Sequence, residues 1–232
     1  MTSHLRLLLG LLAYSCSILS GCSREAGEGK ADPSRTQAPV RVAVAANFTE
    51  PAGQLARAFE KQHPGVKVEL SSGSSGKLYA QIANGAPFDV FLSADADRPT
   101  QLETKGLAVA GSRKLYALGR LVLVGSALKS SSDGESVLRS GEFKHLSIAN
   151  PDTAPYGLAA KQVLVKLGLW EKLEPRIVRG ESITQAHQFV ASGSAELGFV
   201  ALALVLGDTG PRWDVPPARG WRYPSAPNLE CM

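Results

Sequence analysis

Four segments of the chain place small hydroxyl groups, an amide or bare backbone where a predicted strand gives way to a predicted helix. They are residues 46–49 (ANFT), 71–76 (SSGSSG), 154–157 (APYG) and 181–183 (ESI). Ligands of open α/β sheets bind beyond the carboxyl ends of the strands, and helix N-termini offer free N–H groups and the positive end of a dipole. Together these segments can surround a small anion with hydrogen-bond donors.

The scarcity of charge at these positions narrows the choice of anion. Hydrogen bonds to a charged group contribute about 1.5–3 kcal/mol each, so about six fixed donors can offset the desolvation of a dianion without Lys or Arg. A protonated oxyanion such as hydrogen phosphate also needs an acceptor for its proton, and no carboxylate lies within residues 46–49 or 71–76. A binding site for a small carboxylate ligand would be expected to contain an Arg that binds both carboxylate oxygens. The residues therefore favour a fully deprotonated tetrahedral oxyanion of the molybdate, tungstate or sulfate type.

The residues give little support to catalysis or to a resident metal. His63, His145 and His187 are isolated, so they show no metal-ligand spacing. Ser75 lacks the G-x-S-x-G context of an esterase nucleophile and no histidine base can be assigned to it, which leaves an exported hydrolase as the weakest alternative. The Ser/Gly loop is no nucleotide phosphate loop either, since Leu78 stands where Ser or Thr should follow the lysine.

Composition indicates an ordinary globular chain and argues against nucleic acid as a partner. The 232 residues are 44% hydrophobic and 20% charged, enough for one large domain or two lobes with cores of their own. The formal net charge of +4 is mild and aromatic residues make up only 6%. The sequence therefore predicts no basic, aromatic-rich surface for nucleic acid.

The body of the chain alternates between strand and helix. The alternation predicts a parallel or mixed sheet covered on both faces. We expect two α/β lobes, residues 40–119 and 120–207, with the anion site between them. Predicted strands lie at residues 40–46, 66–70, 87–92, 120–124, 146–149 and 196–206, and predicted helices begin near residues 49, 77, 93, 155 and 182.

The N-terminal residues are predicted to form an export signal rather than part of the fold. An apolar stretch at residues 7–19 is too short to span a bilayer comfortably. It ends in Leu19-Ser20-Gly21-Cys22, similar to the lipobox of bacterial lipoproteins, so residues 1–22 read as a lipoprotein-type signal ending at an acylated Cys22. A plain secretory signal is the alternative. Residues 23–39, rich in Gly, Ser and Pro, are expected to be a flexible linker. Only Cys16 in the signal and Cys231 accompany Cys22, so no disulfide framework is available.

Four longer stretches make the chain resemble a known family. They are VAVAANFTEPA at residues 42–52, SSGSSGKLYAQIANGAPFDVFLSAD at 71–95, IANPDTAPYGLAAKQVLVKLG at 148–168 and ELGFVA at 196–201. In this order they resemble the molybdate-binding proteins that feed ABC transporters. The resemblance covers about residues 40 to 206. It implies the type II periplasmic binding fold, an α/β protein with mixed sheets in two lobes that close over the ligand.

The resemblance implies a binding protein and not an enzyme. Such a protein captures molybdate or tungstate and delivers it to an ABC transporter permease in the inner membrane. We expect a periplasmic or cell-envelope monomer, anchored to the membrane by the lipid on Cys22 and without a cofactor. No side chain coordinates the metal, because the oxyanion is held through its oxygens. The serious alternative is a binding protein of the same fold for another oxyanion, such as sulfate or phosphate.

The resemblance also assigns four ligand-binding residues. Asn47 matches a position that binds the oxyanion through its side chain and N–H, and Ser75 matches a serine that binds through its hydroxyl and N–H. In the second lobe Tyr156 stands before the Gly of APYG, and Ile183 would donate its backbone N–H. Each has an ordinary alternative: Asn47 as a turn or helix cap, the Ser75 loop as a connection, Tyr156 as packing and Ile183 as core.

The sequence departs from the family at two site positions and at its end. Ala46 stands where some members have Thr, and Ala201 where some have Tyr, so the chain would rely on Tyr156 instead. Residues 211–232 hold five prolines and no apolar period, which predicts an irregular tail over 208–232 where the family returns to the first lobe. A C-terminal part truncated or altered in this way would uncover apolar surface of the first lobe and weaken stability and lobe closure.

Overall fold

The computed structural model describes residues 38–129 and 134–216, together with the backbone of residues 228–231. The predicted signal at 1–22, with Cys22, and nearly all of the predicted linker at 23–39 lie outside these residues. Within the described part of the chain, no helix combines the length and the apolar character needed to cross a membrane.

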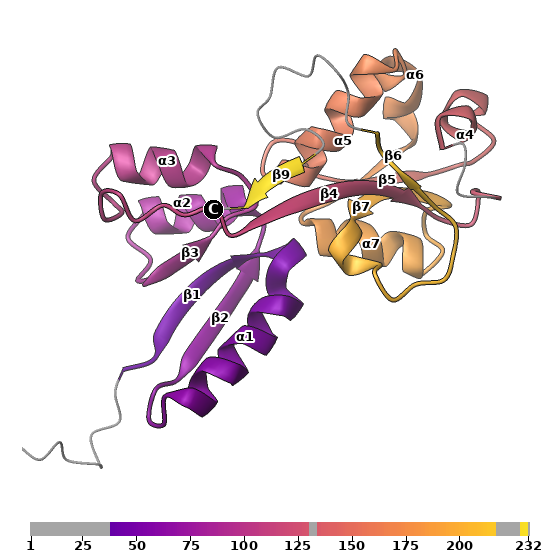
Figure 1. Cartoon of the computed structure of the whole chain (residues 1–232). Coiled ribbons are helices and arrows are strands. Elements are labelled where there is room, and N and C mark those ends of the chain that lie inside the picture. The colour runs from indigo at the N-terminus through magenta and orange to yellow at the C-terminus, as the bar shows by residue number, and fades with distance from the viewer. Residues whose placement is uncertain (1–37, 130–133, 217–227, 232) are drawn as a thin grey trace, which may run out of the picture. The chain divides into compact units, whose positions relative to one another are not determined.

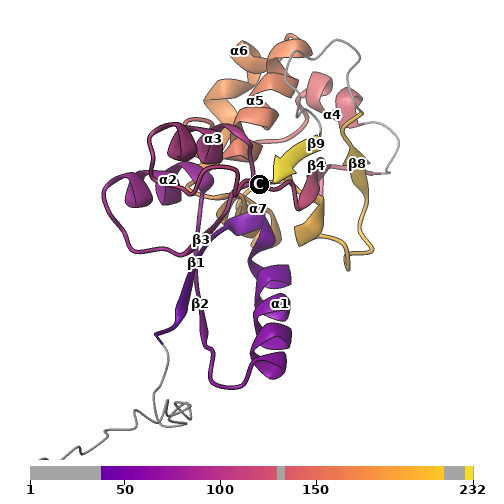
Figure 2. The same cartoon turned by 60° about the vertical axis from the view of Figure 1, so that its left-hand side comes forward.

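The first sheet is parallel and has three strands, β1 (Val40–Ala45), β2 (Val68–Gly73) and β3 (Val90–Leu92), in the order β2-β1-β3. Helix α1 (Thr49–Gln62) joins β1 to β2, and α2 (Ser75–Ala83) joins β2 to β3. The first crossover runs from the central strand β1 to the edge strand β2, and the second runs back in the opposite direction to β3. Because such crossovers are right-handed, α1 lies on one face and α2 on the other (Figures 1 and 2). Helix α3 (Asp97–Thr104) packs beside α2.

The second sheet is mixed. Its strands are β4 (Ala117–Val124), β5 (Leu146–Ala149), β6 (Ile177–Gly180), β7 (Leu197–Ala201), β8 (Arg212–Asp214) and β9 (Asn228–Cys231). The order is β6-β5-β7-β4-β8, with β9 also paired to β4. Strand β5 is parallel to β6 and β7, whereas β4 is antiparallel to β7, β8 and β9.

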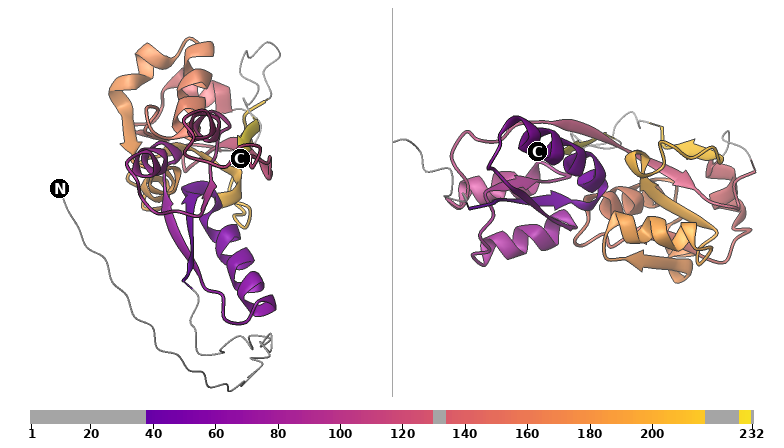
Figure 3. Two further views of the ribbon diagram at one scale, coloured as in Figure 1. Left: turned by 90° about the vertical axis from the view of Figure 1, so that its left-hand side faces the viewer. Right: turned by 90° about the horizontal axis from the view of Figure 1, so that it is seen from below.

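The order β6-β5-β7 repeats the arrangement β2-β1-β3 of the first sheet. Helices α5 (Pro155–Lys166) and α7 (Ile183–Ala191) therefore lie on opposite faces of the second sheet, as α1 and α2 do on the first (Figure 1). Short helices α4 (Gly134–Ser140) and α6 (Trp170–Leu173) complete the unit. The chain passes from the first unit into the second along β4 (Figure 3).

The largest buried side chains concentrate in the second sheet. Leu123, Ile148 and Phe199 are fully buried between the strands and α5. The central strand β1 is buried from Val42 onward, but its apolar residues are mostly alanine and valine. Helix α1 buries little: Leu55 is 61% exposed. Phe59 of α1 and Val90 of β3 are also exposed, so the first unit leaves several large apolar side chains uncovered.

The structure differs from the sequence expectations at several boundaries. The tail predicted to be irregular contains the short strands β8 and β9, because β4 offers two further stretches of pairing. The predicted lobe boundary between 119 and 120 falls inside β4, which pairs throughout with strands of the second sheet. Strand β2 continues into the segment predicted as a loop, since Ser71 to Gly73 pair with Ala43 to Ala45. Strand β7 ends at Ala201, and a 3-10 turn (Leu202–Leu204) follows it.

Candidate functional site

A small cavity lies where the carboxyl ends of the first sheet's strands meet the N-termini of α2, α5 and α7. Its free volume in this arrangement is about 10 Å³. Three helix dipoles present their positive ends here, and no lining side chain carries a charge. The lining residues are Ala45, Ala46, Asn47, Gly73, Ser74, Ser75, Ala94, Ala154, Pro155, Tyr156 and Ile183.

The first sheet contributes an amide and two hydroxyls to the cavity. Asn47 lies in the 3-10 turn Ala46–Phe48 that follows β1, and its side chain is buried. Ser75 is the first residue of α2 and is 0% exposed. The Ala94 N–H donates to Ser75 Oγ over 2.9 Å. This bond occupies a lone pair of the oxygen, so the hydroxyl proton of Ser75 is available for another acceptor.

The second sheet contributes two helix starts. Tyr156 is the second residue of α5, Ile183 is the first residue of α7, and both are buried. The first N–H groups of a helix have no acceptor within the helix, so they are suited to an external anion. Ser182 caps α7 by accepting a hydrogen bond from the Gln185 N–H, which leaves the preceding N–H groups of this turn directed out of the helix.

Gly157 explains how α5 can begin so close to β5. A Cβ at this position would lie 2.2 Å from the carbonyl oxygen of Ala149. Only a glycine allows the first turn of α5 to rest on the end of β5, and this contact places the adjacent Tyr156 in the cavity wall. The glycine of the APYG motif is therefore required by close approach.

The structure brings all four predicted site residues, Asn47, Ser75, Tyr156 and Ile183, into the wall of this one cavity. Their contact with a ligand stays a prediction. Ala46 also lines the cavity. Ala201, at the end of β7, is not in the lining set.

Sequence reasoning included Ser74 and Ala154 in the candidate segments without giving either a contact, and it missed Ala94 as a lining residue. Ser74 lies within the SSGSSG segment, so the serine and glycine pattern contained a signal for it. Ala94 carries no polar side chain, and it lines the cavity because of where the chain turns after β3. No local pattern could have identified it.

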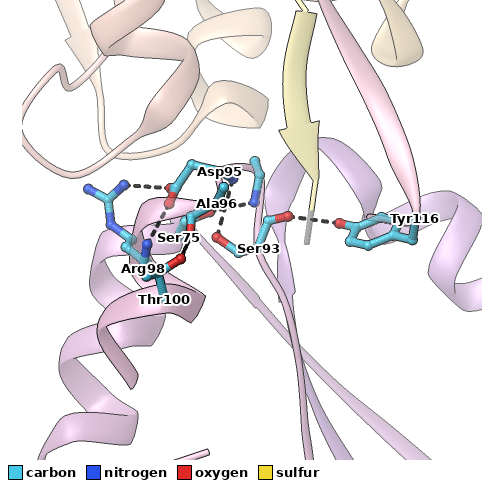
Figure 4. A network of polar contacts seen from close by, with 8 residues as sticks. Ser75, Ser93, Asp95, Ala96, Arg98, Thr100 and Tyr116 are labelled. Atoms are coloured by element: carbon cyan, nitrogen blue, oxygen red, sulfur yellow. Dashed lines mark hydrogen bonds and ion pairs between the residues drawn. The ribbon is translucent and has the colours of Figure 1, made fainter. Parts of the chain in front are cut away.

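The charged groups nearest to the cavity neutralise each other. Asp95 follows the lining residue Ala94, and its Oδ2 accepts a hydrogen bond from Nη1 of Arg98 over 2.6 Å (Figure 4). Its Oδ1 accepts from the Arg98 backbone N–H over 2.8 Å. Tyr116 donates its hydroxyl proton to the Ser93 carbonyl over 3.0 Å, and its ring packs on Phe48. These contacts fix the end of β3 and the 3-10 turn without adding net charge to the site.

Three contacts join the two units around the cavity. The Gly76 N–H donates to the Thr153 carbonyl over 2.9 Å, and the Thr184 hydroxyl donates to the Ala46 carbonyl over 3.2 Å. Lys77 and Glu181 form an ion pair beside them. The cavity is therefore bounded by hydrogen bonds that cross from one unit to the other.

The acidic groups with shifted pKa values lie away from the cavity. The pKa of Glu103 is lowered by hydrogen bonds from the Gly111 N–H and from Arg113. The pKa of Glu196 is lowered mainly by the backbone N–H of His145. In the described part of the chain, no group of three or more His, Cys, Asp or Glu side chains is arranged to hold a metal ion.

Comparison with known proteins places the chain in a family. A model of the bacterial extracellular solute-binding protein family matches residues 40–225. The molybdate-binding protein ModA of Azotobacter vinelandii is 56% identical over 183 residues, which cover 77% of this chain and 72% of that protein. ModA of Rhodobacter capsulatus is 48% identical over 178 residues, covering 76% of this chain and 70% of that protein.

Similarity extends to the structure. The solved periplasmic molybdate-binding protein of Azotobacter vinelandii matches with a TM-score of 0.71 and 46% identity, covering 76% of this chain and 79% of that one. The fold is thus the two-lobe periplasmic binding fold that the sequence predicted. The chain belongs to the bacterial extracellular solute-binding proteins, in the group that contains the molybdate-binding proteins of Azotobacter and Rhodobacter.

Proposed function

We propose that this chain captures molybdate outside the cytoplasm and delivers it to the permease of an ABC transporter. The observation that carries the proposal is the cavity at three helix N-termini, walled by buried hydroxyl, amide and backbone groups and by no charged side chain. The names of the relatives at 56% and 48% identity support the choice of molybdate. Tungstate, an oxyanion of the same shape and charge, is expected to bind to the same groups.

The four predicted contacts divide between the two units. Asn47 and Ser75 bind the oxyanion from the first unit, with the proton of Ser75 directed to it because Ala94 already donates to the oxygen. Tyr156 and the N–H of Ile183 bind it from the second unit. Contacts from the second unit are made only when the units are together, so the ligand stabilises the closed arrangement by its differential affinity for it.

The arrangement disfavours hydrogen phosphate. Its proton requires an acceptor, and no carboxylate lines the cavity, because Asp95, the residue after Ala94, is not part of the wall and is paired with Arg98. Sulfate presents the same charge and the same number of oxygens as molybdate, so the charge of the site does not separate them. Discrimination from sulfate therefore has to come from the size of the closed cavity.

Isothermal titration with molybdate, tungstate, sulfate and phosphate tests this proposal. We expect saturable one-to-one binding of molybdate and tungstate, weaker binding of sulfate and none of phosphate. Preferential binding of sulfate or phosphate would show that the chain is a binding protein of the same fold for another oxyanion. Absence of binding to all four would remove oxyanion capture altogether.

Catalysis by an exported hydrolase has no support at this site. The Ser75 oxygen accepts from the Ala94 backbone, and no histidine lines the cavity. The relatives are named as binding proteins. We therefore propose a transport role without a chemical step. Prolonged incubation with generic ester substrates tests this, and turnover abolished by Ser75→Ala would contradict it.

We also propose that the mature chain is a lipid-anchored monomer attached through Cys22. The lipobox-like sequence at residues 19–22 supports the anchor. A Cys22→Ser variant is expected to move from the membrane fraction to the soluble periplasmic fraction. Release of the wild-type protein without detergent would contradict the anchor. Sedimentation of the chain from residue 23 onward gives the oligomeric state.

A further inference from the structure

Ser74 occupies an unusual position in the cavity wall. It lies between β2 and α2 at the N-cap of α2, and it is only 4% exposed. Its side chain makes no capping hydrogen bond. Within the part of the chain that the structure describes, its Oγ is one of two buried side-chain oxygens without a hydrogen-bond partner, the other being Oγ1 of Thr153.

The comparison with α7 shows that this arrangement is specific to Ser74. Ser182 holds the same N-cap position on α7, and its hydroxyl accepts a hydrogen bond from the Gln185 N–H. N-cap serines are favoured because of this bond. Ser74 has an extended backbone like Ser182 yet leaves the cap unmade. Capping therefore does not explain its hydroxyl.

Burial without a partner is unfavourable for a hydroxyl. An unsatisfied buried donor or acceptor loses its hydrogen bonds to water and gains nothing in return. The neighbouring Ser75 is also buried, but its oxygen accepts from Ala94. Of the two serines, only Ser74 has a hydroxyl without a partner, although both line the same cavity.

We propose that Ser74 is a further ligand-binding residue, which donates its hydroxyl proton to an oxygen of the bound oxyanion. The inference rests on the proposed function and adds a contact to Asn47, Ser75, Tyr156 and Ile183. Ser74, the last residue before α2, and Ser75, the first residue of α2, then both bind the anion. The hydroxyl of Ser74 becomes satisfied only when the anion is present, so it contributes to affinity and not to the stability of the empty protein.

The test compares Ser74→Ala with two serine controls. Ser182→Ala removes a hydroxyl that does cap its helix, and Ser71→Ala removes an exposed one from β2 that does not line the cavity. Each variant is titrated with molybdate, and its thermal unfolding is recorded without ligand. Because a hydrogen bond to a charged group is lost, Ser74→Ala should weaken molybdate binding about ten- to a hundredfold.

Stability of the ligand-free variants separates a binding role from a structural one. Ser74→Ala removes an unpartnered hydroxyl, so its melting temperature should equal or exceed that of the wild type. Ser182→Ala should lower it, and Ser71→Ala should change neither property. Molybdate affinity of Ser74→Ala within twofold of the wild type overturns the proposal. A ligand-free melting temperature lowered as far as in Ser182→Ala also overturns it.

The proposed function can fail separately. If the wild type binds no molybdate, the proposed function and the role of Ser74 are both lost. If the wild type binds and Ser75→Ala weakens binding while Ser74→Ala does not, only the role of Ser74 is lost.

Discussion

The hydroxyl of Ser75 makes one hydrogen bond in the structure and is proposed to make a second one to the anion. Its oxygen accepts from the Ala94 N–H at 2.9 Å, and this directs its proton toward the cavity. A serine at the start of α2 thus links the turn after β3 to the binding site. Substitution there is expected to affect both the local structure and the proposed binding of the anion.

Ser75→Ala is expected to reduce both stability and affinity. The buried Ala94 N–H loses its acceptor, which costs about 1–3 kcal/mol of unfolding free energy. Loss of the charge-assisted hydrogen bond should weaken molybdate binding by a factor of about ten or more. Urea unfolding and calorimetric titration measure the two effects, with Ser71→Ala as the matched exposed control. Unchanged affinity would remove Ser75 from the site.

A second residue, Glu196, gives a prediction on pH. The His145 N–H donates to its carboxylate and lowers its pKa in the folded state. A lowered folded pKa means that the charged form stabilises the fold above the ordinary carboxyl pKa, and that this stabilisation disappears as pH falls through the lowered value. Glu196→Gln should therefore be less stable than the wild type at neutral pH and should lose less stability between about pH 5 and pH 3.

Thermal unfolding of both proteins over this pH range measures the effect. Parallel pH profiles would show that the hydrogen bond from His145 does not contribute. Molybdate affinity at neutral pH serves as a control, because Glu196 does not line the cavity.

Among the elements, α5 depends most directly on a single residue. Its first turn rests on the end of β5, where Gly157 leaves no room for a side chain. Gly53 in α1 is the opposite case, since a Cβ there would meet only a guanidinium nitrogen of Arg57 at 3.4 Å. Both glycines are helical, so they form a matched pair.

Gly157→Ala and Gly53→Ala should change stability in opposite directions. The clash with the Ala149 carbonyl makes Gly157→Ala destabilising by about 1–3 kcal/mol or more. Gly53→Ala reduces the entropy lost on forming α1 and should stabilise by about 0.5–1 kcal/mol. Urea unfolding of both variants measures this. If Gly157→Ala is as stable as the wild type, α5 can shift away from β5 without a cost in free energy, and the prediction is wrong.

Sequence reasoning identified these elements to different degrees, for physical reasons. Strand β5 and helix α5 match their predicted positions closely because buried apolar residues and the Pro155 start mark them locally. Strands β8 and β9 are too short to show a period, and they exist only through pairing with β4. The segments that contain Asn47 and Ser75 could be found because polar residues followed predicted strands, and the family resemblance then singled out these two residues. Ala94 enters the wall only through tertiary structure.

The two units of the molecule differ in how well they are packed. Leu123 on β4 is fully buried, whereas Leu55 on α1 is 61% exposed. The largest buried side chains lie in the second sheet, and the first sheet is held mainly by small residues of β1.

Substitutions at these two leucines should differ sharply in their effect. Leu55→Gln replaces an exposed side chain and should change unfolding free energy by less than about 0.5 kcal/mol. Leu123→Ala leaves a cavity in a packed core and should cost about 2–5 kcal/mol. Urea unfolding measures both. A large cost for Leu55→Gln would mean that α1 is covered in solution.

Approach of the two units depends on Gly76. A Cβ there would lie 2.6 Å from the Thr153 carbonyl oxygen. Gly76→Ala should hold the units apart and weaken molybdate binding by a factor of about ten or more, since each 1.4 kcal/mol of lost interaction is tenfold. Titration and small-angle scattering measure affinity and compaction, with Gly53→Ala as control. If Gly76→Ala binds molybdate as tightly as the wild type, the backbone near Thr153 can move aside at little cost, and the prediction is wrong.

The hydrogen bond between Gly76 and Thr153 can be used to measure how often the two units separate around the cavity. The amide hydrogen of Gly76 is bonded to the carbonyl of Thr153 on the opposite side. It can exchange with deuterium from the solvent only when that bond breaks. Its exchange rate, measured by nuclear magnetic resonance, therefore reports how often the two units separate in solution, without an attached label. The ratio of the rates with and without molybdate gives the free-energy coupling between this separation and molybdate binding.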